Sequence, residues 1–379
     1  MSIRVLHLID SGGLYGAEKM LLALAKAQLN QGLEPVILSA GEPANDEKPL
    51  ELEARRLGLP IKPWRMKPGF NIREGYRIVK WALNNNFDIL HSHGFKFNIL
   101  VGCYPKACRR MPMVATLHGY VHARRFSKIW FYELLDRVAL ALLQGVVLVG
   151  DAMKRELPSV LLRGEKVRVI PNGLDIKGIQ AQADHPIDLP IEDFLANHSP
   201  VVLGVGRLSQ EKGFDRLVES FQILCQKYHN PGLIIVGEGK ERDRLDARIT
   251  ELGLSDKALM PGYCSNVPGL QRRSDLLVMP SHTEGLPITL LEAMAVGITV
   301  LVSPVGEMPA VVGEGEGGYL LAKDCNSEDL GKHIVSSLND SQREVKAKWS
   351  ISKVVRYYSV EAMEERYREV YIAAMGVAV

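Results

Sequence analysis

The stretch "LLVMPSHTEGLPITLLEAMAVG", Leu276 to Gly297, shows the unit from which this chain is built. "LLVMP" has the continuous apolar pattern of a strand buried on both faces, and "SHTEG" is a loop. Pro287 stands where a helix can begin, and Gly297 is placed to end it. A buried strand that leads through a short loop into a helix is the repeating element of a parallel α/β sheet.

The same alternation of strand, loop and helix recurs on both sides of this stretch. Short apolar runs include "IRVLHLID", "FDILHSHG" and "MVATLHG" in the first half, and "PVVLGVGRL", "GLIIVGEG" and "TVLVSP" in the second. Between the halves, Lys177 to Pro200 contains three prolines and is predicted to be a linker. We therefore expect an α/β protein of two doubly wound Rossmann-like domains that face each other across a cleft.

The C-terminal segment "SVEAMEERYREVYIAAM" is predicted to be an amphipathic helix, because Met363, Tyr367, Val370 and Tyr371 recur at helical spacing. We expect the domains to span residues 1–173 and 174–359, with the helix at 360–379 packed on one of them.

Composition indicates a globular protein without a membrane span. The chain has 379 residues and no long apolar run free of charged residues, and "MSIRVLHLIDSGG" has no leader pattern. We therefore expect a cytoplasmic protein. Its five cysteines lack the paired spacing of a zinc site, so we expect reduced, buried thiols.

Charge is unevenly distributed along the chain. Residues 1–172 contain 25 Lys and Arg against 15 Asp and Glu, and the remainder contains 21 against 29. The basic clusters are Arg109-Arg110, Arg124-Arg125-Lys128, Lys154-Arg155 and Arg163 to Arg168. Such a surface attracts phosphates or anionic lipid headgroups, and a solvated face without a partner is the equally weighted alternative.

The loop and helix of the opening stretch carry two carboxylates that suit a sugar nucleotide. Glu284 lies at the carboxyl end of the strand, and Glu292 lies inside the helix among apolar residues, where a carboxylate needs a partner. The free amides of Gly285 and Leu286 lie at the helix N-terminus. Carboxylates accept hydrogen bonds from sugar hydroxyls, and free helix amides bind phosphate.

A second loop, in "LGVGRLSQEKGFDRLVESF", brings two cations to a strand end. Arg207 follows the strand and Lys212 precedes the next helix, with Gly206 and Gly213 on either side. Two cations at this place would neutralise a diphosphate and stabilise it as a leaving group. A surface Arg and Lys beside a turn remain the structural alternative.

The N-terminal half offers a glycine loop and histidines at strand ends. Gly12, Gly13 and Gly16 separate the first strand from a helix, which fits an anion or merely a tight turn. His93 and His118 follow two strands and are candidates for proton transfer or for hydrogen bonding to a sugar. A metal site of His91, His93 and His118 is disfavoured, since no carboxylate stands at ligand spacing, and His91 is expected to be buried.

Taken together, these elements resemble the retaining glycosyltransferases of the large family often called GT4, which have the two-domain GT-B fold. The resemblance covers nearly the whole chain. Its elements are the loop Gly12 to Glu18, "TLHG", "IPNGLD", "VGRLSQEKG" and the E-x7-E element "EGLPITLLE". It implies a nucleoside-diphosphate sugar held mainly by the C-terminal domain, an acceptor held mainly by the N-terminal domain, no obligatory metal or other cofactor, and a C-terminal helix on the N-terminal domain.

The resemblance also implies individual roles. Glu284 would bind the donor sugar with help from the amides near Gly285 and Leu286, and Glu292 would bind the ribose. Arg207 and Lys212 would hold the diphosphate. Because "GGLYGAE" stands where many members have "GGAE", either Gly13 or Gly16 can be the glycine that faces the diphosphate, and Gly13 is preferred. His118 is assigned to the sugar near its anomeric carbon, and His93 and Tyr15 are assigned to the acceptor side.

The expected activity is transfer of a hexose, with retention, to a hydroxyl of a glycan or lipid-linked sugar, as in the synthesis of cell-surface polysaccharide or lipopolysaccharide. The basic N-terminal half adds peripheral contact with an anionic membrane. The alternatives are a non-catalytic subunit that binds nucleotide sugars, and a sugar phosphorylase or epimerase of the same build. Neither nucleic-acid binding nor a metal is expected.

Overall fold

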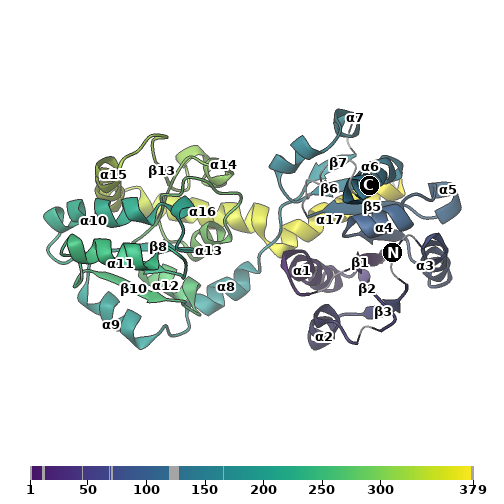
Figure 1. Ribbon diagram of the computed structural model, residues 1–379, viewed down its shortest axis with the longest axis horizontal. Coiled ribbons are helices and arrows are strands. Elements are labelled where there is room, and N and C mark those ends of the chain that lie inside the picture. Colours follow the sequence, from purple (N-terminus) through teal and green to yellow (C-terminus); the bar gives the residue numbers. More distant parts are fainter. Residues whose placement is uncertain are drawn as a thin grey trace. The chain divides into compact units, whose positions relative to one another are not determined.

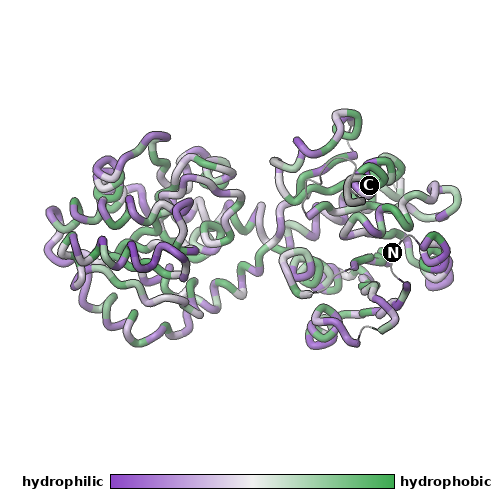
Figure 2. Tube along the Cα trace, viewed as in Figure 1, coloured by the Kyte–Doolittle hydropathy of each residue, from purple (hydrophilic) through white to green (hydrophobic). Residues whose placement is uncertain are grey.

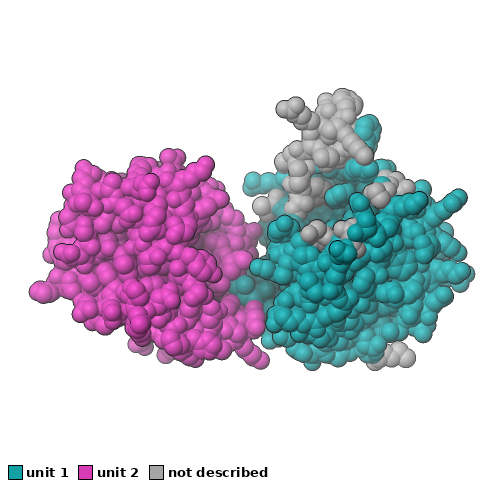
Figure 3. Space-filling model, turned by 60° about the horizontal axis from the view of Figure 1, so that its bottom comes forward, with its two compact units in different colours: residues 1–174, 358–379 teal, residues 175–357 magenta. Residues whose placement is uncertain are grey.

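The computed structural model describes residues 2–10, 13–44, 46–67, 69, 71–118, 128–164 and 166–376. The chain divides into two compact units, which Figure 3 shows in different colours. Unit 1 comprises Met1–Leu174 and Tyr358–Val379, and unit 2 comprises Asp175–Tyr357. Each unit contains a parallel sheet with helices around it, so the α/β fold class expected from the sequence is confirmed (Figure 1).

Unit 1 has a parallel sheet in the order β3-β2-β1-β4-β5-β6-β7. Its strands are β1 (Arg4–Asp10), β2 (Glu34–Gly41), β3 (Ile61–Arg65), β4 (Ile89–Ser92), β5 (Met113–Leu117), β6 (Gly145–Leu148) and β7 (Val167–Val169). The helices are α1 (Gly16–Asn30), α2 (Pro49–Arg56), α3 (Ile72–Asn84), α4 (Phe95–Leu100), α5 (Lys106–Arg109), α6 (Lys128–Leu142), the 3₁₀ helix η1 (Asp151–Glu156) and α7 (Ser159–Leu162). The inner strands β4, β5 and β6 are buried throughout, as in a sheet covered on both faces.

Unit 2 repeats this plan with the order β10-β9-β8-β11-β12-β13. Its strands are β8 (Val201–Val205), β9 (Gly232–Val236), β10 (Ala258–Gly262), β11 (Leu276–Met279), β12 (Val300–Val302) and β13 (Tyr319–Leu320). The helices are α8 (Ile176–Ala183), α9 (Leu189–Asn197), η2 (Gln210–Lys212), α10 (Phe214–Lys227), α11 (Arg242–Glu251), α12 (Val267–Arg273), α13 (Ile288–Val296), α14 (Met308–Val311), η3 (Gly313–Gly315), α15 (Ser327–Asn339) and α16 (Arg343–Tyr358). Figure 2 shows the outer helix α11 as largely hydrophilic.

The last helix, α17 (Val360–Met375), packs on unit 1. Its residues Met363, Tyr367 and Tyr371 are buried in one cluster with Met20 and Leu24 of α1. Two backbone hydrogen bonds join the start of α17 to Leu174. The amide of Leu174 donates to the carbonyl of Tyr358 at 2.8 Å, and the amide of Val360 donates to the carbonyl of Leu174 at 3.0 Å. The helical spacing read from the sequence therefore corresponds to a buried helix face.

The predicted linker from Lys177 to Pro200 is wrong. The segment forms α8 and α9 within unit 2, and α8 packs against α12 and α13. Its prolines did not interrupt these helices, because Pro190 occupies the first turn of α9, where no backbone N–H is needed. Asp175 caps α8 by accepting from the amide of Gly178 at 2.9 Å.

The cysteine prediction is correct for two residues and wrong for two. Cys264 and Cys325 are buried and Cys225 is partly buried, whereas Cys103 and Cys108 are exposed, and all are free thiols.

Among the described residues, every helix is too short or too polar to span a bilayer. The basic residues Arg124 and Arg125 and the glycine Gly12 lie outside the described residues.

Candidate active site

The strand order of unit 2 reverses between the neighbouring strands β8 and β11. Open α/β sheets bind ligands beyond the carboxyl ends of strands at such a reversal, because the loops there turn away to opposite sides. Residues 206–213 follow β8 and residues 280–287 follow β11. The amide of His282 donates to the carbonyl of Glu211 at 2.8 Å, so the two loops are joined.

Lys212 and Glu284 meet at this point as an ion pair. The ammonium Nζ of Lys212 lies 2.5 Å from Oε1 of Glu284, and the hydroxyl of Ser281 donates to the same oxygen at 2.9 Å. The side chains are 20% and 10% exposed. No described residue hydrogen-bonds the second oxygen, Oε2, which leaves this carboxylate able to accept from a ligand hydroxyl.

Glycines allow the loops to approach this closely. Gly213 has a φ of +66°, and a Cβ at that position would collide with the carbonyl oxygen of Pro280. Gly306 has a φ of +59°, and its Cβ would collide with the carbonyl of Glu284. A side chain at either position would push the loops apart, so these glycines are required by both backbone conformation and space.

The N-terminus of α13 is open for a ligand. Pro287 stands as the cap before the helix, which Gly297 ends in the left-handed region with a φ of +79°. Neither Gly285 nor Leu286 donates its amide to another described residue, and a Cβ at Gly285 would meet no atom within 4 Å. Unpaired amides at a helix N-terminus favour an anion.

Glu292 lies in the second turn of α13, between the buried residues Leu291 and Ala293. Burial raises the pKa of its carboxyl group. The carboxylate has no hydrogen-bond partner among the described residues, which is unusual for a half-buried charge. Its geometry therefore suits a ligand that supplies hydroxyl donors.

Arg207 follows β8 as expected, but its side chain is turned toward a neighbouring acid. Its guanidinium is 71% exposed and pairs with Glu211 at 2.6 Å. Hydrogen bonds from the backbone amide of Glu211 itself, from Ser209 and from Arg207 lower the pKa of Glu211 to about 2. Because an exposed pair of this kind contributes little stability, Arg207 can exchange its partner for a phosphate at low cost.

In unit 1 the strand order reverses between β1 and β4. The predicted glycine loop follows β1, His93 follows β4, and His118 follows the next strand, β5. Tyr15 caps α1, which begins at Gly16, and the backbone amide of Tyr15 donates to the carboxylate of Glu18 at 2.8 Å. The Tyr15 side chain is 73% exposed. A Cβ at Gly13 would overlap the Tyr15 ring, whereas one at Gly16 would meet nothing. The Tyr15 ring is exposed and can turn aside, so this overlap alone does not require glycine at position 13.

Three histidines of unit 1 form a buried row that ends at His118. Nδ1 of His7 lies 3.0 Å from Nε2 of His93, and Nδ1 of His93 lies 3.4 Å from Nε2 of His118. His93 is therefore not open to an acceptor as predicted, because both of its ring nitrogens are occupied and it is buried. Burial lowers the pKa of His7 and of His118 to about 4 each, so both are neutral near pH 7.

His7 is the functional candidate that the sequence reading missed. The register of β1 and β4 pairs His7 with His91, which is buried as expected. Ring nitrogens of His7, His91 and His93 lie within 4.8 Å of one another, as in a metal site. Each of these nitrogens already has a hydrogen-bond partner, so a metal ion would have to displace those bonds. A histidine in the middle of the apolar run "IRVLHLID" was the available signal.

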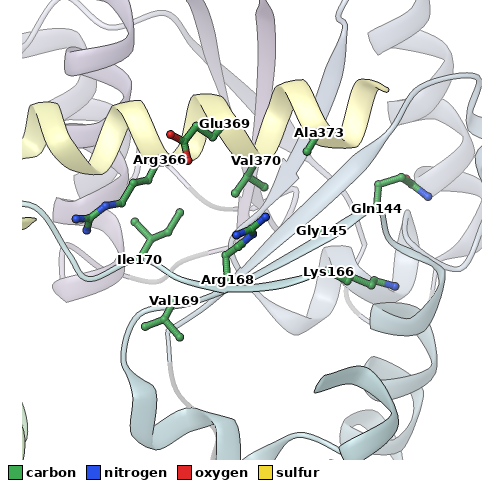
Figure 4. Close-up of a pocket in the computed structure, with 10 residues that line it drawn as sticks. All are labelled: Gln144, Gly145, Lys166, Arg168, Val169, Ile170, Arg366, Glu369, Val370 and Ala373. Atoms are coloured by element: carbon green, nitrogen blue, oxygen red, sulfur yellow. The ribbon is translucent and has the colours of Figure 1, made fainter. Parts of the chain in front are cut away.

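A cavity of about 490 Å³ lies elsewhere in unit 1, between β7 and α17 (Figure 4). Arg168 of β7 and Lys166, directly before that strand, line one side of the cavity. Arg366 and Glu369 of α17 also line it. Its wall includes Gly145, at the amino end of β6. The cavity contains none of the predicted site residues, which lie after the carboxyl ends of strands.

Comparison with known proteins agrees with this geometry. Residues 15–177 match the model of Glycosyltransferase Family 4, and residues 191–352 match that of Glycosyl transferases group 1. An uncharacterised glycosyltransferase of Methanocaldococcus jannaschii is 27% identical over 72% of this chain and 74% of its own length. The UDP-Gal:alpha-D-GlcNAc-diphosphoundecaprenol alpha-1,3-galactosyltransferase of Escherichia coli is 24% identical over 78% of this chain and 77% of its own.

Among solved structures, the Anabaena protein Alr3699/HepE in complex with UDP has a TM-score of 0.70, with 21% identity over 97% of this chain and 99% of its own. This similarity identifies the fold. The two family models match consecutive parts of the chain that correspond to most of unit 1 and most of unit 2. The chain therefore belongs to family 4 of the glycosyltransferases and is a glycosyltransferase of the GT-B fold.

Proposed function

We propose that the chain transfers a hexose, with retention of configuration, from a nucleoside-diphosphate sugar to a hydroxyl of a glycan or of a lipid-linked sugar. The observation that carries the donor assignment is the Lys212–Glu284 pair beside the unpaired amides of Gly285 and Leu286. A cation, an open carboxylate oxygen and free helix amides together match a sugar hydroxyl next to a diphosphate.

The remaining donor contacts follow from chemistry at the same loops. Glu292 would accept hydrogen bonds from a ribose diol, which supplies the partner that its half-buried carboxylate lacks. Arg207 would leave Glu211 for the diphosphate. We propose a UDP sugar as the first donor to test, because the Escherichia coli relative uses UDP-Gal by its name and the Anabaena neighbour was solved with UDP.

The chemical step that we propose needs no protein nucleophile. The acceptor oxygen forms a bond to the anomeric carbon on the face from which the bond to the diphosphate oxygen breaks, and the acceptor proton passes to that departing oxygen. Lys212 and Arg207 would stabilise the charge that develops on the diphosphate, so the step needs no bound metal ion. Glu284 would hold the sugar in place while the bonds exchange.

For unit 1 we propose the acceptor role. His118 would hydrogen-bond the reacting sugar, and Tyr15 is exposed and free to contact the acceptor. Gly13 and Gly16 remain the two candidates for the diphosphate, with Gly13 preferred. His93 would act through His118, since it touches His118 and is itself buried.

A helix of unit 1 supports the proposed contact with an anionic membrane. Phe131, Leu134, Leu135, Val138 and Leu142 are exposed and recur on one side of α6. The segment just before this helix contains the basic residues Arg124 and Arg125. An apolar row that follows basic residues in the sequence suits the interface of an anionic bilayer. We propose that such a membrane, where a lipid-linked acceptor would lie, covers this row.

Vesicle binding tests the membrane contact. The protein should sediment with vesicles that contain anionic lipid, less so with neutral ones, and salt should weaken the binding. The pair of substitutions Leu134→Ser and Val138→Ser should reduce binding, whereas Val160→Ser, at an exposed apolar residue on α7, should not. Equal binding to both vesicle types would rule the proposal out.

Thermal unfolding with UDP, GDP, ADP and their sugar conjugates tests the donor site, with a chelator present throughout. A nucleotide at a hundred times its dissociation constant adds roughly 2.7 kcal/mol to the free energy of unfolding. Selective stabilisation followed by retained-configuration transfer from that donor supports the proposal. Turnover that depends on phosphate, or epimerisation of the donor without acceptor, would replace it with the phosphorylase or epimerase alternative.

A further inference from the structure

The histidine row below His118 is one end of a longer hydrogen-bonded chain in unit 1. The chain starts at Tyr367 of α17, whose hydroxyl lies 2.9 Å from that of Thr116. It continues through His91 (2.8 Å), Tyr371 (2.7 Å), Gln28 (3.1 Å), His7 (2.8 Å), His93 (3.0 Å) and His118 (3.4 Å). Every member except His118 is buried.

Each member can pass on one hydrogen. A neutral imidazole has one N–H and one lone pair, and a hydroxyl has one hydrogen. A glutamine amide presents its NH₂ to one neighbour and its oxygen to the other. Burial holds the pKa of His91 and His93 well below the ordinary value, so these rings are neutral like His7 and His118. If every bond is made, all hydrogens therefore point the same way along the chain.

Two directions are possible, and the Gln28 amide separates them. In the first direction, the amide nitrogen of Gln28 faces Tyr371, and each group donates to its neighbour on the side of Tyr367. Tyr367 then accepts from Thr116, and its own hydroxyl hydrogen has no acceptor in the chain. With the amide turned by 180°, both contacts remain and the hydrogens run toward His118. Tyr367 then donates to Thr116, so its hydroxyl hydrogen has an acceptor. The second N–H of Gln28 lies outside the chain in both directions and does not distinguish them.

Tyr367 decides between these directions. Its side chain is 1% exposed, and Thr116 is its only hydrogen-bond partner among the described residues. A buried hydroxyl hydrogen without an acceptor is unfavourable, whereas a chain that runs toward His118 leaves its last hydrogen on the one member that is not fully buried. The second direction is therefore the stable one.

We propose that this chain fixes His118 as the tautomer with hydrogen on Nδ1, so that the ring offers a hydrogen-bond donor and cannot act as a general base there. Nε2 of His118 accepts from His93, and Nδ1 has no partner among the described residues. Given the proposed function, the ring would donate to an oxygen of the reacting sugar. Tyr367, Gln28, His7 and His93 are then positioning residues for His118.

The tautomer can be measured in the free full-length protein. Histidine labelled with ¹⁵N gives correlation spectra that distinguish a protonated ring nitrogen from an unprotonated one, and His118→Asn identifies the signals of His118. At pH 7 we expect hydrogen on Nδ1 alone. Hydrogen on Nε2, or a mixture of both forms, would overturn the inference.

A variant that cuts the last link tests whether the chain is the cause. His93→Phe keeps a ring of similar shape but removes the bond to His118, so we expect both tautomers of His118 to appear. Met20→Leu, in the same buried cluster on α1, should leave the wild-type spectrum unchanged. A pure Nδ1–H form in folded His93→Phe would overturn the role of the chain, and the wild-type spectrum decides the tautomer even if this variant does not fold.

Transfer kinetics then connect the tautomer to function. In His93→Phe, kcat/KM for transfer should fall in proportion to the fraction of His118 that carries hydrogen on Nδ1. A protein with the expected tautomer but no transfer would refute the proposed function and leave the tautomer assignment intact. Full activity in a variant with a mixed tautomer would overturn the donor role of His118.

Discussion

Replacing Lys212 by alanine should separate catalysis from folding most clearly. The substitution removes the ammonium that lies 2.5 Å from Glu284, and leaves that carboxylate with the hydroxyl of Ser281 alone. The pair is neither fully buried nor fully exposed, at 20% and 10% exposure of its side chains. Its loss should therefore cost roughly 1–2 kcal/mol, between the values for exposed and buried pairs. For a unit of this size this corresponds to a fall of a few degrees, about 2–8 °C, in melting temperature.

The effect on transfer should be much larger. If Lys212 stabilises the departing diphosphate, its charge acts mainly in the transition state, where one such donor contributes roughly 3–4 kcal/mol. We expect kcat to fall by about a hundredfold to a thousandfold. Initial rates of sugar transfer at saturating donor, measured beside thermal unfolding, report both quantities for the same preparation.

Lys332→Ala is the matched control, because Lys332 forms an exposed pair with Glu328 on α15. It should change neither transfer nor melting temperature measurably. Wild-type kcat in folded Lys212→Ala would refute the diphosphate role. Unfolding of Lys212→Ala at room temperature would show instead that the pair is structural.

Three further perturbations have defined outcomes. Glu292→Gln should raise KM for the donor roughly tenfold, because the variant loses one carboxylate acceptor. Its stability in urea at neutral pH should be equal to or higher than that of the wild type, because burial disfavours the native carboxylate, and a stability loss above about 1 kcal/mol would contradict this. Gly213→Ala should destabilise unit 2 by about 2–3 kcal/mol more than Gly253→Ala, because Gly253 has nearly the same φ (+65°) but open space around it. Equal effects of the two substitutions in urea unfolding would exclude the clash with Pro280. His7 has a folded-state pKa of about 4 against an ordinary value of 6.5, so the unfolded chain binds more protons at this residue between these values. Of the stability lost from pH 6.5 to 4, roughly 3 kcal/mol should come from His7, and a His7→Gln variant with an unchanged acid dependence would exclude that contribution.

The sequence was sufficient to predict the fold class and the loops that carry the site. Continuous apolar runs that end in turn residues are the pattern of strands buried on both faces, so "LLVMP" and its neighbours could be assigned without tertiary information. Parallel strands end at the same edge, which places Arg207, Lys212 and Glu284 on neighbouring loops. The local pattern also located the end of α13, since Gly297 takes the left-handed conformation.

What the sequence did not reveal depends on contacts between distant residues. Arg207 pairs with Glu211 although both could have faced the ligand, because an exposed side chain takes the nearest opposite charge. The prolines of the predicted linker looked like helix breakers, yet Pro190 lies where a helix tolerates it. His7 meets His91 and His93 only through the register of β1 with β4, which no local pattern specifies.

The buried chain of unit 1 is difficult to explain by stability alone. Leu or Phe at the positions of His7, His91 and His93 would fill similar space without polar atoms, and replacing a buried polar network by apolar residues is often neutral or stabilising. The histidines also lose stability in acid, because burial lowers their pKa values. What an apolar core could not supply is a fixed hydrogen direction at the edge of the sheet. That direction reaches only His118, whose Nδ1 has no partner among the described residues, so the benefit of the chain must be sought in what His118 binds.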